Sequence, residues 1–256
     1  MKEGLVSIIT PTYNSEQFIV QTIQSVQAQT YKNWEMLIVD DCSTDSTFEI
    51  LKQQSTLDSR IKIQKLNTNS GAGSARQYAL DMAQGRFIAF LDSDDLWKPN
   101  KLSEQIEYLI KNDIAITFSS YELMDEEGKV LNILIKVPKS ITYQELFYCN
   151  WIGNLTGVYD TVKLGKISIS NYRKRQDWIM WLHILKSEKR ATSIQKNLAT
   201  YRVRSNSISA SKISLLKSNY LVYRNYHKQN LVKSCFSMII FLYNQLIIKK
   251  RYIVKL

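Results

Sequence analysis

The sequence predicts an α/β fold with a mainly parallel central sheet and a helical, basic C-terminal extension. Three features of the 256 residues indicate the sheet. Short β-branched runs alternate with helical patterns through the first 120 residues, which implies right-handed crossovers between parallel strands. The runs are continuously apolar, as in sheets that are covered on both faces. Each run also ends in polar or acidic residues, at the sheet edge where such folds bind ligands.

Five strands are predicted in the first half, at residues 5–10, 34–40, 61–66, 86–92 and 114–119. The intervening helices have recognisable starts. Asn14 and Ser15 are cap candidates for a helix whose apolar residues run from 18 to 26. Ser46 and Glu49 have capping-box spacing. Pro99 suits the first turn of a further helix.

The second half is less regular. It predicts a hairpin around Gly128, a short helix at 141–147 and a helix that Asp177 caps. Strands at 191–195 and 198–203 precede two basic, aromatic-rich helices from residue 212 onward. We therefore divide the chain into two halves of one domain and an extension, with the ranges 1–120, 121–211 and 212–256.

The formal net charge of +11 is unevenly distributed. Residues 1–128 hold 11 Lys/Arg and 19 Asp/Glu, whereas residues 129–256 hold 23 Lys/Arg and 4 Asp/Glu. The basic half could bind nucleic acid or an anionic membrane surface, or it could be a solvated face with no binding partner. No helix-turn-helix, RNA-stacking or zinc motif accompanies the charge, so we expect no nucleic acid partner.

One apolar stripe near the C-terminus favours the membrane surface. The residues at helical spacing are Phe236, Ile239, Ile240, Tyr243 and Ile247. Basic residues 249–251 follow directly, as in an interfacial helix. The same stripe could instead pack on the rest of the chain or on another subunit. The apolar stretch 235–248 is too short, and too interrupted by polar residues, to predict a membrane span.

Cysteine usage and the N-terminus bear on the compartment. The three cysteines form no C-x-x-C pair, which argues against a zinc site or a disulfide framework. Their odd number fits a reducing cytoplasm. The N-terminal apolar run is shorter than a signal peptide requires. We expect a cytoplasmic location, with the inner face of the plasma membrane as the place of any membrane contact.

Two acidic motifs follow predicted strands. Asp92, Ser93 and Asp94 form a D-x-D element, in which two carboxylates can hold Mg²⁺ or Mn²⁺ and leave positions for phosphate oxygens. The alternative is an acidic surface turn. Asp40 and Asp41 end another strand and suit a base N–H or a ribose hydroxyl. Their alternative is an interaction with the dipole of the next helix.

A glycine-rich segment follows the third predicted strand. Gly71, Gly73 and Arg76 resemble a dinucleotide-binding fingerprint, with arginine in place of the last glycine. That fingerprint normally follows the first strand, so a dehydrogenase is disfavoured. The glycines allow a tight turn into the helix. Arg76 is then expected near a phosphate group or paired with an aspartate.

Four motifs occur together in order, namely PTYN (11–14), VDDCSTDST (39–47), NTNSGAGSAR (67–76) and FLDSDDLW (90–97). They resemble the family 2 glycosyltransferases of the GT-A fold. RQDWIMWL (175–182) and YRVRSNSIS (201–209) extend the match. The whole chain is similar to small bacterial enzymes that build cell-wall and surface polysaccharides, such as the teichuronic acid glycosyltransferases.

The resemblance implies specific roles. Pro11, Tyr13 and Asp41 would line the base and ribose of a nucleotide-sugar donor, with UDP favoured by Asp41. Asp92 and Asp94 would reach the ribose and a metal on the diphosphate. Asp177 would be the catalytic base, in a Q-D element where many relatives have E-D. The remaining implied donor residues are Arg76, which lies near the donor, and Arg202 and Arg204, on a basic loop that closes over the diphosphate.

The implied activity is inverting transfer of one sugar to a glycan or lipid-linked acceptor. Processive relatives carry a Q-x-x-R-W motif and membrane spans, and neither is recognised in this sequence. A sugar nucleotidyltransferase would show a Gly-rich basic loop after the first strand, where PTYN stands. A non-catalytic binding protein would lack the base or the D-x-D element. Asp177 could still be a plain helix cap, and Trp178 could stack on a sugar or lie in the core.

Overall fold

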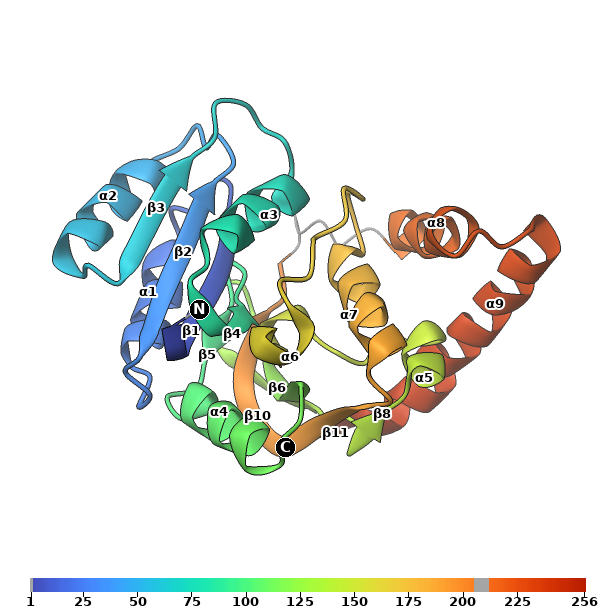
Figure 1. Ribbon diagram of the computed structural model, residues 1–256. Helices are drawn as coiled ribbons and strands as arrows, with labels where there is room; N and C mark the ends of the chain where they lie inside the picture. The colour runs from blue at the N-terminus through green and yellow to red at the C-terminus, as the bar shows by residue number, and fades with distance from the viewer. Residues whose placement is uncertain (1, 205–211) are drawn as a thin grey trace.

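The computed structural model describes residues 2–204 and 212–256, which form helices on both sides of one mixed sheet (Figure 1). The main strand order is β11-β7-β6-β9-β4-β1-β2-β3. Its strands are β1 (Lys2–Thr12), β2 (Trp34–Asp40), β3 (Ile61–Lys65), β4 (Gly85–Phe90), β6 (Ile116–Met124), β7 (Val130–Ile135), β9 (Val158–Asp160) and β11 (Ile253–Lys255). Strand β10 (Ala191–Arg202) pairs with β6 and with the short strands β5 (Leu96–Trp97) and β8 (Ser140–Ile141).

The first half is the parallel α/β unit that the sequence predicts. Strand β1 pairs in parallel with β2 and β4, and β2 pairs in parallel with β3. Every residue of β2 is buried, because helices cover both faces of the sheet. The covering helices are α1 (Ile19–Gln27), α2 (Thr47–Leu57), α3 (Ala72–Met82) and α4 (Lys101–Lys111).

The predicted helix starts need correction. Helix α1 begins at Ile19 with Phe18 at the N-cap, so neither Asn14 nor Ser15 caps it. Ser46 does occupy the N-cap of α2, but its side chain makes no capping bond, and Glu49 pairs with Lys52 instead. Pro99 lies before the N-cap of α4 rather than in its first turn. The polar residues at these strand-to-helix loops bond to neighbouring loops, which local sequence patterns do not reveal.

The second half extends the same sheet. Gly128, with φ +92°, lies in the predicted hairpin between β6 and β7, and α5 (Tyr143–Phe147) is the predicted short helix. Two strands were expected at 191–203, but β10 is one strand with register shifts near Asn197. Strand β9 was not predicted. It lies antiparallel between β4 and β6, so β6 continues the sheet in the direction of β4. The short helices η1 (Asn154–Thr156) and α6 (Thr161–Leu164) flank β9.

Helix α7 (Gln176–Ser187) fills the centre of this half. Trp178 and Trp181 are fully buried, so Trp178 belongs to the core and does not stack on a ligand. Its indole N–H donates to the Leu146 carbonyl oxygen at 2.8 Å. The ring of Trp178 also contacts Phe241, with centroids 5.3 Å apart, which ties α7 to the C-terminal helix.

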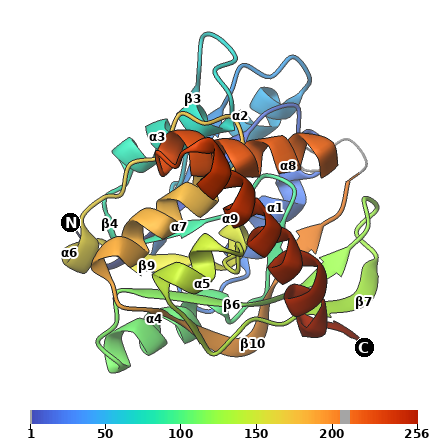
Figure 2. The ribbon, with the colours of Figure 1, turned by 90° about the vertical axis from the view of Figure 1, so that its right-hand side faces the viewer.

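The C-terminal segment lies along this half of the molecule (Figure 2). It contains α8 (Lys212–Leu221), η2 (Val222–Tyr226), α9 (Leu231–Tyr243), η3 (Asn244–Ile248) and η4 (Lys249–Tyr252). From Leu231 to Tyr252 the helix runs for 22 residues, long and apolar enough to cross a membrane by length and composition. The helix thus continues on both sides of the stretch 235–248, which taken alone was judged too short to span a membrane. The chain then returns to the sheet, where β11 pairs with β7.

Candidate active site

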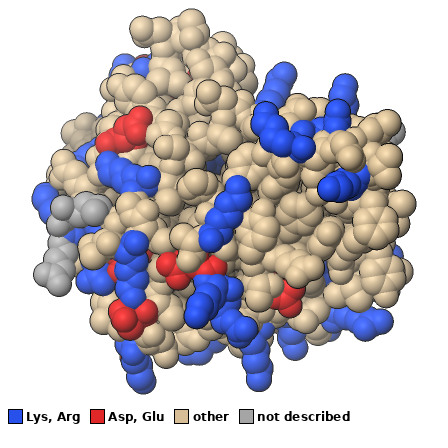
Figure 3. Space-filling view, turned by 45° about the vertical axis from the view of Figure 1, so that its right-hand side comes forward, with Lys and Arg blue, Asp and Glu red and all other residues tan. Residues whose placement is uncertain are grey.

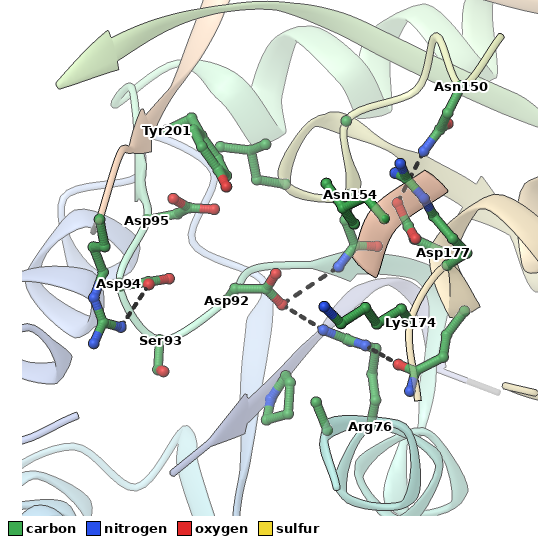
Figure 4. Close-up of a pocket in the computed structure, with 18 of the residues that line it drawn as sticks. Arg76, Asp92, Ser93, Asp94, Asp95, Asn150, Asn154, Lys174, Asp177 and Tyr201 are labelled. Atoms are coloured by element: carbon green, nitrogen blue, oxygen red, sulfur yellow. Dashed lines mark hydrogen bonds and ion pairs between the residues drawn. The ribbon is translucent and has the colours of Figure 1, made fainter. Parts of the chain in front are cut away.

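A pocket of about 600 Å³ opens at the carboxyl ends of β1 and β4 (Figure 4). One wall carries the D-x-D loop, and the opposite wall carries the start of α7 and the inner side of the C-terminal helix. Eight of the sequence-predicted site residues line it, namely Pro11, Tyr13, Arg76, Asp92, Ser93, Asp94, Asp177 and Arg204. The structure thus brings together segments that are more than 150 residues apart in the chain.

The D-x-D carboxylates are held by arginines. Asp92 accepts a hydrogen bond from Arg76 at 2.8 Å, which answers whether Arg76 pairs with an aspartate. Asp94 accepts from Arg204 at 2.9 Å. The Ser93 hydroxyl lies 2.8 Å from the Ser15 hydroxyl, which joins this loop to the one after β1. Charge-assisted bonds of this kind fix both carboxylates at the pocket wall.

Arg202 is buried behind the D-x-D loop and does not line the pocket. Its backbone N–H donates to the Asp95 carboxylate, and its guanidinium donates to the Asp94 carbonyl oxygen. Burial, together with the charges of Asp94 and Asp92, raises the pKa of Asp95 well above its usual value. The expected basic loop therefore has two parts, because Arg202 is structural while Arg204 faces the pocket.

The donor set at this loop fits a divalent cation that is shared with a ligand. Burial raises the pKa of Asp94, Arg204 opposes this, and the Asp92 charge raises it further. A cation beside both carboxylates would relieve their repulsion. Residues 2–204 and 212–256 contain no cluster of three or more His, Cys, Asp or Glu that could enclose a metal. Water and phosphate oxygens would have to complete the shell, as is usual for Mg²⁺.

Asp40 and Asp41 brace the loops and lie outside the pocket lining. Asp40 is fully buried and accepts from the Ser43 backbone N–H at 3.1 Å. Asp41 accepts from the backbone N–H groups of Ser70 and Gly71, each at 2.7 Å. Gly71 has φ +88°, a conformation that favours glycine, so this turn depends on it.

Arg76 connects the two walls of the pocket. One guanidinium nitrogen binds Asp92, and the other donates to the Gln176 side-chain oxygen at 2.6 Å. Gln176 packs so closely on Gly73 that a Cβ there would lie 2.5 Å from the amide nitrogen. Gln176 therefore accepts the arginine bond that a glutamate would accept. Gly73, the second glycine of the motif, therefore allows the Gln176 side chain to pack against the backbone of α3.

Asp177 lies in the first turn of α7, whose N-cap is Arg175. The prediction that Asp177 caps this helix was wrong. Its carboxylate instead accepts from the Asn150 side-chain amide at 3.1 Å. Figure 4 shows Asp177 across the pocket from Asp94. A carboxylate in this position is free to accept a proton from a ligand bound in the pocket.

Sequence reasoning missed several pocket residues. Asn150 contacts Asp177, and Asn154 donates to Asp92 at 3.4 Å. Both lie in the irregular segment before β9, where no periodic pattern marks them. Tyr121 and Tyr201 also line the pocket, and burial raises the pKa of Tyr121. Tyr201 lies within a predicted strand, whereas Tyr121 lies in the part of β6 beyond the predicted range 114–119.

Comparison with known proteins shows the same architecture. TarS of S. aureus (residues 1–349, with UDP) superposes with a TM-score of 0.68 at 22% identity, covering 94% of this chain and 71% of TarS. The mannosyltransferase PcManGT of Pyrobaculum calidifontis, with GDP-Man and Mn²⁺, gives 0.68 at 16% identity over 94% of this chain and 70% of its own. These likenesses confirm the GT-A fold.

Sequence comparison shows the family. The model for glycosyl transferase family 2 matches residues 7–173. TuaG of Bacillus subtilis (strain 168), which is assigned by name to teichuronic acid biosynthesis, is 42% identical over 96% of this chain and 97% of its own. The UDP-Glc:alpha-D-GlcNAc-diphosphoundecaprenol beta-1,3-glucosyltransferase WfgD of Escherichia coli is 41% identical over 86% and 85%. The chain therefore belongs to the family 2 glycosyltransferases.

Proposed function

We propose that this chain is an inverting, single-transfer enzyme that moves a sugar from a UDP-sugar to a glycan or lipid-linked acceptor. The main support is the position of the acidic side chains in the pocket. The D-x-D carboxylates and Asp177 face one pocket from opposite walls, and Arg76 and Gln176 fix their separation. A donor diphosphate and an acceptor hydroxyl could therefore meet between them.

The donor is assigned to the wall formed by residues 1–120. Pro11 and the half-exposed Tyr13 would contact the base, and Asp92 would reach the ribose. Asp94 and Asp92 would hold Mn²⁺ or Mg²⁺, and Arg204 would approach the diphosphate. Arg204 lies at the pocket wall, where its guanidinium donates to Asp94 at 2.9 Å and its Nε lies 4.0 Å from a Glu126 carboxylate oxygen. TarS complexes with UDP and UDP-GlcNAc support the choice of nucleotide.

The base is assigned to the half formed by residues 121–211. Asp177 would take the proton of the acceptor hydroxyl while that oxygen attacks the anomeric carbon. The bond from the anomeric carbon to the phosphate oxygen breaks as the new glycosidic bond forms. Because attack comes opposite the leaving group, the anomeric configuration inverts. A divalent cation, when bound, would neutralise charge on the departing UDP.

A product assay tests this proposal. The chain would be incubated with a UDP-sugar, Mn²⁺ and an acceptor sugar linked through a diphosphate to a lipid. We expect one added sugar per acceptor, together with free UDP in equal amount. A ladder of longer products would contradict single transfer. Absence of product with every nucleotide sugar tested would contradict the enzymatic assignment.

The extension formed by residues 212–256 is assigned to peripheral contact with an anionic membrane at the inner face of the plasma membrane. Figure 3 shows a broad uncharged surface flanked by lysines and arginines. The C-terminal helix carries an exposed apolar stripe, made of Val232, Phe236, Ile239, Tyr243 and Ile247. Four of the five residues predicted for this stripe are exposed, while Ile240 is half-buried. This pattern suits an interfacial helix.

Contact at the surface fits the structure better than a span across the bilayer. The inner side of the same helix buries Phe241 against Trp178, and the rings of Tyr252 and Trp151 lie 5.0 Å apart. Strand β11 then pairs with β7. A membrane-spanning position would remove these contacts, whereas docking through the outer stripe would keep them.

Vesicle flotation tests the membrane contact. The double substitution Phe236→Asp and Ile239→Asp is expected to lower the fraction bound to anionic vesicles by at least about tenfold, since burial of each side chain is worth about 1.5–3 kcal/mol. Leu57→Asp, at a residue 78% exposed on α2, is the matched control and should float like the unaltered chain. Failure of the unaltered chain to float with anionic vesicles would exclude the contact.

A further inference from the structure

The pocket wall beside Asp177 contains four basic side chains that have no role in the proposed reaction. Arg173, Lys174, Arg175 and Lys249 all line the pocket. Lys174 donates to the Ser214 hydroxyl at 2.9 Å, and Arg175 donates through Nε to the Asn219 side-chain oxygen at 2.6 Å. Both contacts join the start of α7 to α8. They place these side chains at the junction between the catalytic domain and the C-terminal extension.

Lys249 also lines the pocket at this wall, although it comes from the end of the chain. It lies in η4, close to the end of the C-terminal helix, and its ammonium group donates to the Asn150 carbonyl oxygen at 2.6 Å. Asn150 is also the residue whose side chain holds Asp177. The lysine is half-buried, and its charge lies 5.8 Å from the ring centroid of Trp151. Lys249 is thus fixed next to the candidate base.

These cations differ from the arginines of the donor wall. Arg76 and Arg204 each pair with a D-x-D carboxylate at 2.8–2.9 Å. Neither Arg175 nor Lys249 has an ion pair within 4.0 Å among residues 2–204 and 212–256. Burial lowers the pKa of both groups, although the Asp177 charge partly opposes this. Partly buried cations without counter-ions favour an anionic ligand.

We propose that Arg175 and Lys249, assisted by Lys174, form a subsite for the diphosphate of a sugar-diphosphate-lipid acceptor. The inference rests on the proposed function and names its acceptor. The donor diphosphate is assigned to the opposite wall, at Asp92 and Asp94, which Figure 4 shows across the pocket from Asp177. An anion at Arg175 and Lys249 would therefore belong to the molecule whose hydroxyl Asp177 deprotonates.

The C-terminal helix connects this subsite to the membrane. Its outer side presents the apolar stripe, and its inner side contributes Phe241, Gln245 and Lys249 to the pocket. A lipid anchored in the bilayer would thus present its diphosphate at the inner side of the same helix. Phosphate groups suit this position, because a diphosphate separates the lipid from the sugar and carries charge that both cations can bind.

Binding in solution tests the subsite without relying on turnover. The probe is a short-chain alkyl diphosphate-linked sugar, titrated calorimetrically into the full chain with UDP and Mn²⁺ saturating the donor wall. Lys249→Met is expected to weaken its affinity about tenfold, as for loss of a charged hydrogen bond. Lys249→Arg should restore most of the affinity. Lys217→Met, at an exposed position on α8, is the matched control and should bind like the unaltered chain.

A second ligand separates the diphosphate from the sugar. The alkyl glycoside of the same sugar, which lacks the diphosphate, should bind the unaltered chain and Lys249→Met equally. Lys174→Met supplies a second variant, with an expected loss of about threefold, should Lys249→Met fail to fold. Equal diphosphate affinity in all variants would overturn the subsite. Binding that depends on Lys249 without sugar transfer would instead contradict the proposed function and leave the subsite standing.

Discussion

Replacing Asp177 with asparagine is expected to lower kcat by about 10³-fold, because general-base catalysis typically contributes 10²–10⁴-fold. The amide occupies the same volume and can still contact Asn150, but it cannot take the proton of the acceptor hydroxyl. Donor binding should be nearly intact, since Asp177 lies across the pocket from the D-x-D loop. Initial rates of transfer and the affinity for UDP are the two measurements needed.

The control for this variant is Asp113→Asn, which makes the same chemical change at a surface ion pair with Lys163. It should leave both the rate and the affinity unchanged. Normal turnover in Asp177→Asn would remove this residue from the base role. A parallel loss of UDP affinity would show that Asp177 organises the donor wall instead.

Replacing Asp94 with alanine is expected to abolish the metal-dependent part of donor binding. Asp94 is the D-x-D carboxylate whose repulsion from Asp92 a cation would relieve, and its loss leaves too few protein oxygens beside the diphosphate. In the unaltered chain, UDP-sugar with Mn²⁺ should raise the melting temperature, because a ligand that binds only the folded state stabilises it by mass action. In Asp94→Ala most of this rise should disappear.

Chelation of the metal provides the matching experiment on the unaltered chain. With EDTA, UDP-sugar should give the small rise that Asp94→Ala gives with Mn²⁺. The melting temperature without ligand should not fall on adding EDTA, since the metal is proposed to bind together with the donor. A full UDP-sugar effect in Asp94→Ala, or in EDTA, would show that the donor is held without a cation at this loop.

The strands could be predicted from sequence because burial on both faces imposes long apolar runs. Residues 34–40 were predicted as a strand with the bounds that β2 has in the structure. Helix starts were less predictable, because Asn14 and Ser46 follow strands whose loops contact one another. Asn14, for example, accepts a hydrogen bond from the Thr44 backbone 30 residues away. Strand β11 was missed because three residues carry no pattern of their own.

Some residues of the site could likewise be predicted from the sequence, and others could not. Motif residues at strand ends could be found, since the topology of a parallel sheet brings those ends together. Which of these residues line the pocket could not be predicted, because Asp41 and Arg202 differ from Asp92 and Arg204 only in their contacts. The part of the YRVRSNSIS motif from 205 to 209 lies outside the described residues. Lys249 could not be predicted, because only the fold shows that the end of the chain lies beside Asp177.

The anomeric configuration of the product shows whether the sugar is transferred with inversion. Direct displacement assisted by Asp177 predicts that a sugar α-linked to UDP becomes β-linked to the acceptor. The anomeric proton coupling in the NMR spectrum of the purified disaccharide reports this configuration for sugars such as glucose. The predicted result is a β-linked product, which Asp177→Asn forms about 10³-fold more slowly than the unaltered chain. An α-linked product would contradict it.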